Sequence, residues 1–178
     1  IHSDSPNKPW IMLVHGLFGN LDNLSALRRQ FTEFFQVLSI DLPDHGKSAF
    51  TQTFSFVHYA KLISELVDSL EIKRLSVVGH SLGGYIALAF AEKHPQKVKG
   101  LCLMIATSNE DTSERKALRL RANKMIANNF RNVVRMSFAN LFGPKSKTIF
   151  KEEIELAISE ALQTSMQGYI AAQEGMRI

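Results

Sequence analysis

Short apolar segments alternate with longer helix-forming segments along the first 106 residues, and this alternation is the strongest constraint on the fold. Four segments have the length and composition of buried strands: residues 10–14, 37–42, 75–78 and 98–106. Between them, apolar residues are spaced as on one helix face over residues 24–35, 56–70 and 82–93. Strands joined by helices usually run parallel, so we expect an α/β fold with a mostly parallel sheet and helices on both faces.

The pattern changes after residue 106. A polar stretch leads into residues 112–176, which show helical spacing and no segment typical of a strand. Gly143 and Pro144 interrupt these helices, because proline cannot continue a helix. We therefore predict two units: a sheet-containing core over residues 1–109 and an all-helical segment over residues 110–178.

The composition excludes several classes of protein. Of the 178 residues, 45% are hydrophobic and 21% charged, as in ordinary globular domains. No apolar run approaches the roughly 20 residues that span a bilayer, so we expect no stable membrane insertion. The net charge is +4, and the basic residues cluster in residues 115–135 without a nucleic-acid-binding motif. We interpret this cluster as a solvated helical face and expect no nucleic-acid partner.

The single cysteine, Cys102, lies inside an apolar run. A lone cysteine forms no disulfide within the chain, which fits a cytoplasmic location, and small apolar side chains of this kind are usually buried. We therefore expect Cys102 to be a buried thiol.

The GHSLG motif of residues 79–83 directly follows the third strand segment and opens the next helix. Small residues on both sides suit a sharp strand-to-helix turn in which backbone segments approach closely. Such a turn exposes the Ser81 hydroxyl at the carboxyl edge of the sheet, beside the N–H groups of a helix N-terminus. A helix-capping serine would not explain glycines on both sides, so we predict that Ser81 is a nucleophile.

A second motif, HGLFG over residues 15–19, follows the first strand segment. Acyl transfer needs backbone N–H donors aimed at the developing oxyanion. The N–H of Leu82 is one expected donor, because it follows the nucleophile. Leu17 is the expected second donor, with Phe18 as the alternative, and we interpret His15 as a structural, hydrogen-bonding histidine.

A third motif, DLPDHGKS over residues 41–48, lies between these two in the chain. In this order the three motifs resemble those of the α/β-hydrolase superfamily, and residues 15–23 (HGLFGNLDN) resemble its small bacterial serine esterases. The family usually has glycine or asparagine where this chain has Asp44. The resemblance covers residues 10–106 well and the helical remainder loosely, and it implies structural roles for Asp41 and His45.

The resemblance implies a serine hydrolase without cofactor or metal that cleaves small carboxylic esters, thioesters or lactones through an acyl-enzyme. Residues 110–178 resemble the family's helical cap, whose apolar residues either line an acyl pocket or pack the cap onto the core: Met125, Met136, Phe138, Phe142 and Met166. For the substrate pocket we expect Phe18, His80, Phe138 and Phe142. Carbon–carbon bond hydrolases and cofactor-free haloperoxidases share these motifs and remain alternatives. The oligomeric state is not readable from the sequence.

In this family an acid and then a histidine follow the nucleophile in the chain, but no histidine follows His94 here. We therefore expect a central piece of the fold, truncated at both ends, whose base and acid lie outside these residues. His45 or His94 as base, and Glu110 or Asp111 as acid, are the less favoured possibilities. The chain alone should turn over little substrate, and a non-catalytic or inactive protein on this scaffold is the second hypothesis.

Overall fold

Four strands form one parallel sheet in the computed structural model, which describes residues 7–49 and 55–177. Their order across the sheet is β2-β1-β3-β4, and β1 pairs in parallel with both β2 and β3. The expected parallel sheet is confirmed. The strands are β1 Trp10–Val14, β2 Gln36–Ile40, β3 Leu75–His80 and β4 Val98–Met104.

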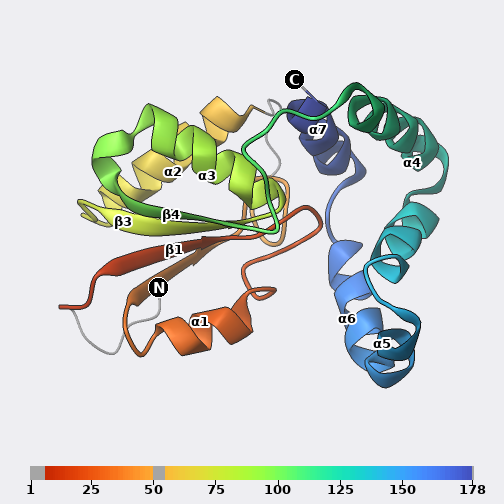
Figure 1. Cartoon of the computed structure of the whole chain (residues 1–178), viewed down its shortest axis with the longest axis horizontal. Coiled ribbons are helices and arrows are strands. Elements are labelled where there is room, and N and C mark those ends of the chain that lie inside the picture. The colour runs from red at the N-terminus through yellow and green to blue at the C-terminus, as the bar shows by residue number, and fades with distance from the viewer. Residues whose placement is uncertain (1–6, 50–54, 178) are drawn as a thin grey trace.

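Helices cover both faces of the sheet, as expected (Figure 1). Side chains alternate along each strand, so Met12 and Val14 pack with the helices α2 and α3, whereas Ile11 and Leu13 face α1. A short 3₁₀ turn, Pro95–Lys97, leads from α3 into β4. The helices are α1 Ser25–Phe31, α2 Phe56–Ser69 and α3 Leu82–Lys93.

The remaining four helices gather beyond the carboxyl ends of the strands (Figure 1). A separate apolar cluster joins α4, α6 and α7, whereas α5 packs against α6, and the cluster includes Phe18 from the loop after β1, Ile126, Val134 and Tyr169. α7 also reaches the main core through Met176. These helices are α4 Ser113–Ala139, α5 Pro144–Ile149, α6 Lys151–Ala161 and α7 Met166–Arg177. The division between core and cap near residue 109 stays a prediction.

α4 is divided by an internal kink. Asn129 has φ −157° and ψ 54°, so helical backbone stops there and resumes without an intervening loop. Met125 and Met136 are 56% and 57% exposed, so neither packs the cap onto the core nor lines a buried pocket. Phe138 and Met166 do pack in the cap cluster. No helix among the described residues is long and apolar enough to cross a membrane.

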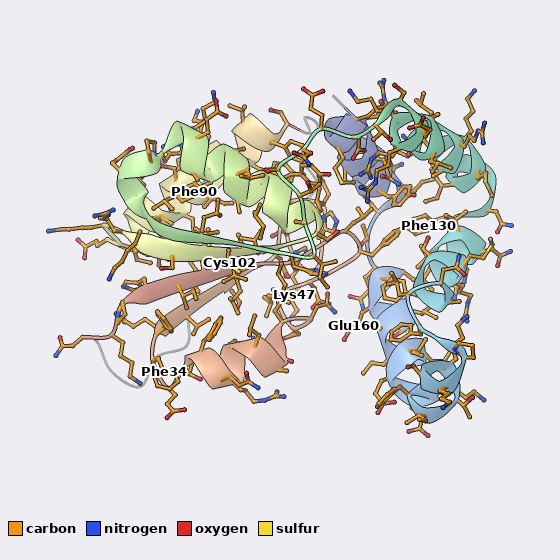
Figure 2. All side chains as sticks on the ribbon, in the orientation of Figure 1. Phe34, Lys47, Phe90, Cys102, Phe130 and Glu160 are labelled. Atoms are coloured by element: carbon orange, nitrogen blue, oxygen red, sulfur yellow. The ribbon has the colours of Figure 1, made fainter. Side chains whose placement is uncertain are left out.

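Cys102 is exposed, and the expectation of a buried thiol is wrong. It lies on β4 (Figure 2), opposite Val78 of β3, and therefore on the sheet face that α1 covers. However, α1 packs against β2 at the other side of the sheet. β4 pairs only with β3 among the described strands, so Cys102 lies uncovered at the edge.

Candidate active site

Ser81 occupies a strained turn between β3 and α3. Its φ of 50° and ψ of −115° lie in a region that L-residues rarely adopt. The glycines on both sides of Ser81 have no room for a side chain, because a Cβ on Gly79 would lie 2.4 Å from the Gly83 carbonyl oxygen. A Cβ on Gly83 would lie 2.4 Å from the carbonyl oxygen of Val14. The sequence therefore folds into the sharp strand-to-helix turn that the motif predicts.

The strand order places this turn where ligands bind in α/β sheets. From β1 the chain goes first to β2 on one side and then to β3 on the other, so the order reverses between β1 and β3. Val14 pairs with Gly79, so the loops that follow β1 and β3 leave the sheet side by side. A Cβ on Gly16 would lie 3.2 Å from the Ser81 Cβ, and the Ser81 hydroxyl has no hydrogen-bond partner among the described residues.

Backbone N–H groups beside Ser81 also lack acceptors. Within residues 7–49 and 55–177, no acceptor is bonded to the N–H of Leu82, Leu17 or Phe18. Leu82 opens α3, where the first N–H groups of a helix have no partner inside the helix. Phe18 has a φ of 63°, and the Gly19 N–H donates to the Gly16 carbonyl across the turn at 3.0 Å. Both loops thus offer donors to a developing negative charge.

His15 and Asp41 hold the loop after β1 in place. The Asp41 carboxylate accepts from the N–H groups of Leu21 at 2.7 Å and Lys47 at 2.9 Å. His15 Nδ1–H donates to the Gly16 carbonyl at 2.8 Å, and its Nε2 accepts from the Leu42 N–H at 3.0 Å. Both ring nitrogens are satisfied in the neutral form, and burial lowers the pKa of His15 to about 4. These contacts match the structural roles expected for both residues.

Asp44 adopts a φ of 66°, which explains why the family favours glycine or asparagine at this position. Its carboxylate accepts from the Tyr59 hydroxyl at 2.9 Å. His45 is buried, and its Nδ1–H donates to the Pro43 carbonyl at 3.0 Å. Neither residue lines the two cavities beside Ser81.

One of those cavities is aromatic and has a volume of about 590 Å³. Three of the residues expected in the substrate pocket, Phe18, His80 and Phe138, line this cavity together with Leu141 and Tyr169. The ring of Tyr169 stacks on Phe18 at 4.9 Å, and burial lowers the pKa of His80, which keeps its ring neutral near pH 7. The fourth predicted pocket residue, Phe142, is not among the lining residues, because the turn after α4 brings Leu141 there instead.

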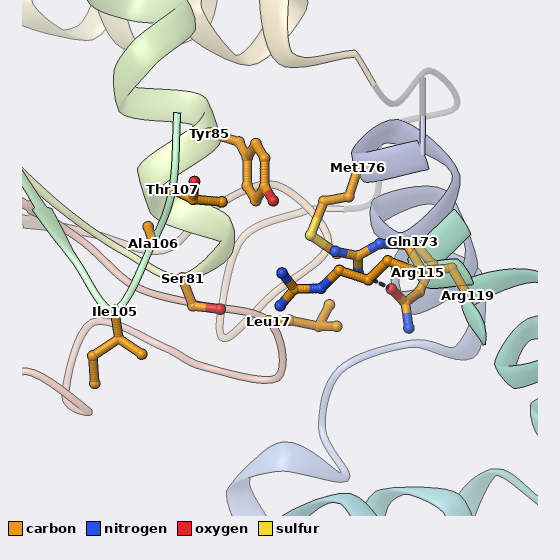
Figure 3. Close-up of a pocket in the computed structure, with 10 residues that line it drawn as sticks. All are labelled: Leu17, Ser81, Tyr85, Ile105, Ala106, Thr107, Arg115, Arg119, Gln173 and Met176. Atoms are coloured by element: carbon orange, nitrogen blue, oxygen red, sulfur yellow. Dashed lines mark hydrogen bonds between the residues drawn. The ribbon is translucent and has the colours of Figure 1, made fainter. Parts of the chain in front are cut away.

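The second cavity, of about 400 Å³, is basic (Figure 3). Ser81, Arg115, Arg119 and Gln173 are among the residues that line it. Arg119 donates to the Asp111 carboxylate and, through Nη1, to Gln173 Oε1 at 2.6 Å. The interpretation of this basic segment as a solvated face is therefore wrong for Arg119, whose side chain is 15% exposed. Helical spacing puts Arg115 and Arg119 on one face but does not say which face meets the core.

Asp111 is a buried partner of Arg119 in this structure. Its side chain is inaccessible to solvent, and the hydrogen bond from Arg119 lowers its pKa, so the carboxylate stays charged. The Tyr85 hydroxyl also donates to it at 3.4 Å. Glu110 has an 88% exposed side chain. No group of three or more His, Cys, Asp or Glu among the described residues could hold a metal ion.

No histidine in residues 7–49 and 55–177 makes a hydrogen bond with the Ser81 hydroxyl. His80 comes nearest in the chain and lines the aromatic cavity with Ser81. The histidines concerned are His15, His45, His58, His80 and His94.

Fold and turn geometry together define a hydrolase-type α/β scaffold, and comparison with known proteins identifies the family. A family model described as the alpha/beta hydrolase fold matches residues 9–156. The chain therefore belongs to the α/β-hydrolase fold family.

Individual relatives cover the chain only in part. A putative esterase/lipase of Haemophilus influenzae is 32% identical over 98 residues, which are 55% of this chain and 34% of that protein. An Escherichia coli K12 esterase is 34% identical over 88 residues, 49% of this chain and 33% of the relative. The chain thus spans about a third of the length of these curated relatives.

Solved structures match over almost the whole chain. A thermophilic esterase from Thermogutta terrifontis superposes with a TM-score of 0.86 at 25% identity, covering 95% of this chain and 63% of that one. A hydrolase from Pseudomonas aeruginosa PA01 has the same TM-score of 0.86 at 22% identity, and the match covers 97% of this chain and 65% of that one. The second match shows the shared fold alone.

Proposed function

We propose that this protein is a serine hydrolase that cleaves small carboxylic esters, thioesters or lactones through an acyl-enzyme. One observation carries the proposal: the Ser81 hydroxyl lies on a strained turn beside backbone N–H groups, and neither the hydroxyl nor those N–H groups have a hydrogen-bond partner among the described residues. Relatives named as esterases support the substrate class.

In the proposed reaction, Ser81 Oγ attacks the carbonyl carbon while a base takes the hydroxyl proton. The N–H groups of Leu82 and Leu17 bind the oxyanion of the tetrahedral intermediate, with Phe18 as the alternative second donor. The bond to the leaving group then breaks, the base returns its proton to that group, and water hydrolyses the acyl-enzyme. We infer that the base and its acid partner come from outside the described residues, because no described histidine is hydrogen-bonded to the Ser81 hydroxyl.

Two alternatives remain on the same scaffold. A non-catalytic binding protein would not need the backbone strain at Ser81, which costs about 1–3 kcal/mol and is found mainly at functional sites. Carbon–carbon bond hydrolases and cofactor-free haloperoxidases would use the same nucleophile. Labelling of Ser81 therefore does not distinguish these enzymes, and the rates of ester cleavage, carbon–carbon bond hydrolysis and haloperoxidation have to be compared as well.

The test uses the natural protein, with its length established by intact-mass measurement. A fluorophosphonate should label Ser81, and a p-nitrophenyl ester should be hydrolysed. Ser81→Ala should abolish labelling and lower turnover at least about a thousandfold. Ser76→Ala, a change in the preceding strand that lies outside both cavities, is the matched control and should retain both. An unlabelled wild-type protein would rule out the nucleophile and favour the binding hypothesis.

A further inference from the structure

Two cavities of different chemistry meet at Ser81. The aromatic cavity and the basic cavity share Leu17, Ser81, Ile105 and Gln173 in their walls. An ester whose carbonyl carbon lies at Ser81 has two substituents, which leave that carbon in different directions. One substituent would therefore enter an aromatic space and the other a space lined by arginine side chains.

Of the two arginines in the basic cavity, Arg115 is the one whose guanidinium is free to bind a ligand. In Figure 3 its side chain extends from the start of α4 toward Ser81. The side chain is 62% exposed, and its closest charged partner is Asp111, with Nε and Oδ1 4.0 Å apart. The terminal guanidinium nitrogens of Arg115 have no hydrogen-bond partner within residues 7–49 and 55–177.

The neighbouring charges leave this cavity positive. Asp111 is already paired with Arg119, which also donates to Gln173 at 2.6 Å. The two arginines thus face one carboxylate. Glu110, which precedes Asp111 in the chain, does not line the cavity; its side chain is 88% exposed and lies 4.0 Å from Lys116. Arg119 is held in the wall, whereas the charge of Arg115 remains available to a ligand.

We propose that Arg115 selects substrates in which an oxyanion group, a carboxylate or a phosphate, lies on one side of the scissile carbonyl and an apolar group on the other. This proposal rests on the proposed function, because it takes Ser81 as the attacking group. A guanidinium binds either oxyanion through two parallel N–H···O bonds, which a lysine cannot reproduce. A hydrogen bond to a charged group corresponds to roughly a tenfold or larger preference.

The experiment compares methyl esters with the same three-methylene spacer in the natural protein. Monomethyl glutarate ends in a carboxylate, methyl valerate ends in a neutral methyl group, and methyl 4-(phosphonooxy)butanoate ends in a phosphate. We expect kcat/KM for at least one anionic ester to exceed that for methyl valerate about tenfold, and the better of the two identifies the oxyanion. The preference should weaken as salt is added, because the guanidinium is partly exposed.

Variants assign the preference to one residue. Arg115→Gln should lower the ratio of kcat/KM between the anionic and the neutral ester about tenfold, and Arg115→Lys should restore it only in part. Arg121→Gln is the matched control, because it removes the same charge from α4 at an exposed position outside the cavity. It should leave the ratio unchanged.

Labelling of Ser81 by a neutral fluorophosphonate, measured on the same preparations, separates the two proposals. Absence of labelling in the wild-type protein would overturn the proposed function. A labelled wild-type protein that hydrolyses all three esters equally well would overturn the role of Arg115 alone. A ratio that Arg115→Gln leaves unchanged, in a variant that is still labelled at the wild-type rate, would overturn it as well.

Discussion

At position 83 the space for a side chain is occupied by the backbone of β1, with the Val14 carbonyl oxygen 2.4 Å from a Cβ placed there. We predict that Gly83→Ala lowers the free energy of unfolding by about 1–3 kcal/mol, because neither backbone segment can move away without disturbing the sheet. Urea denaturation would measure the change. Gly100→Ala is the matched control, since its Cβ would meet only the Ser76 side chain, with Oγ at an ordinary 3.4 Å and Cβ at 4.0 Å. Equal losses in both variants would contradict the close approach.

Burial lowers the pKa of His15 from 6.5 to about 4 and also lowers that of His45. The folded protein therefore keeps these rings neutral at pH values where the unfolded chain binds protons. Stability should fall as the pH decreases from about 6.5 toward 4. We expect the free energy of unfolding at pH 5 to be lower than at pH 7.5, with His15 contributing on the order of 2 kcal/mol. Identical urea midpoints at the two pH values would contradict this prediction.

At the scale of elements, the buried carboxylate of Asp111 helps to join α4 to α7. Asp111 precedes α4, and its side chain is inaccessible to solvent. Arg119 of α4 forms an ion pair with Asp111 and also donates a hydrogen bond to Gln173 of α7. Asp111→Ala should cost about 3 kcal/mol of unfolding free energy, because it leaves the charge of Arg119 without a carboxylate partner in a largely buried site.

The matched control for this pair is Arg135→Gln. It breaks the pair with Glu155, in which the two side chains are 47% and 55% exposed. Exposed pairs contribute less than about 1 kcal/mol. Comparable losses for the two variants in urea denaturation would show that Asp111 is not a structural anchor of α4.

At the scale of the whole molecule, β4 pairs with no strand other than β3 among the described residues, and the exposure of this strand can be measured through the Cys102 thiol. Cys102 is exposed on β4, and Leu101 beside it is 39% exposed. We expect the folded protein to react with a disulfide reagent such as DTNB at a rate close to that of a free thiol. The urea-unfolded protein provides the reference rate. A folded rate lower by about a hundredfold or more would mean that β4 is covered in solution.

The sequence by itself determined the order of strands and helices, the parallel sheet and the turn at Ser81. These features depend on short-range information. Apolar runs of four to nine residues specify the strands, and the glycines on both sides of Ser81 permit a backbone approach that no other residue allows. The family motifs add the loop after β1, whose contacts with Asp41 and His15 match the structural roles expected from sequence.

Only the tertiary structure decided which side chains surround Ser81. Periodicity places Arg115 and Arg119 on one face of α4 but is silent on whether that face meets solvent or the core. The same limit applies to Leu141, which lines the cavity where Phe142 was expected. It applies also to Cys102, whose exposure depends on where α1 packs across the sheet. These outcomes follow from contacts between segments far apart in the chain, which local spacing does not encode.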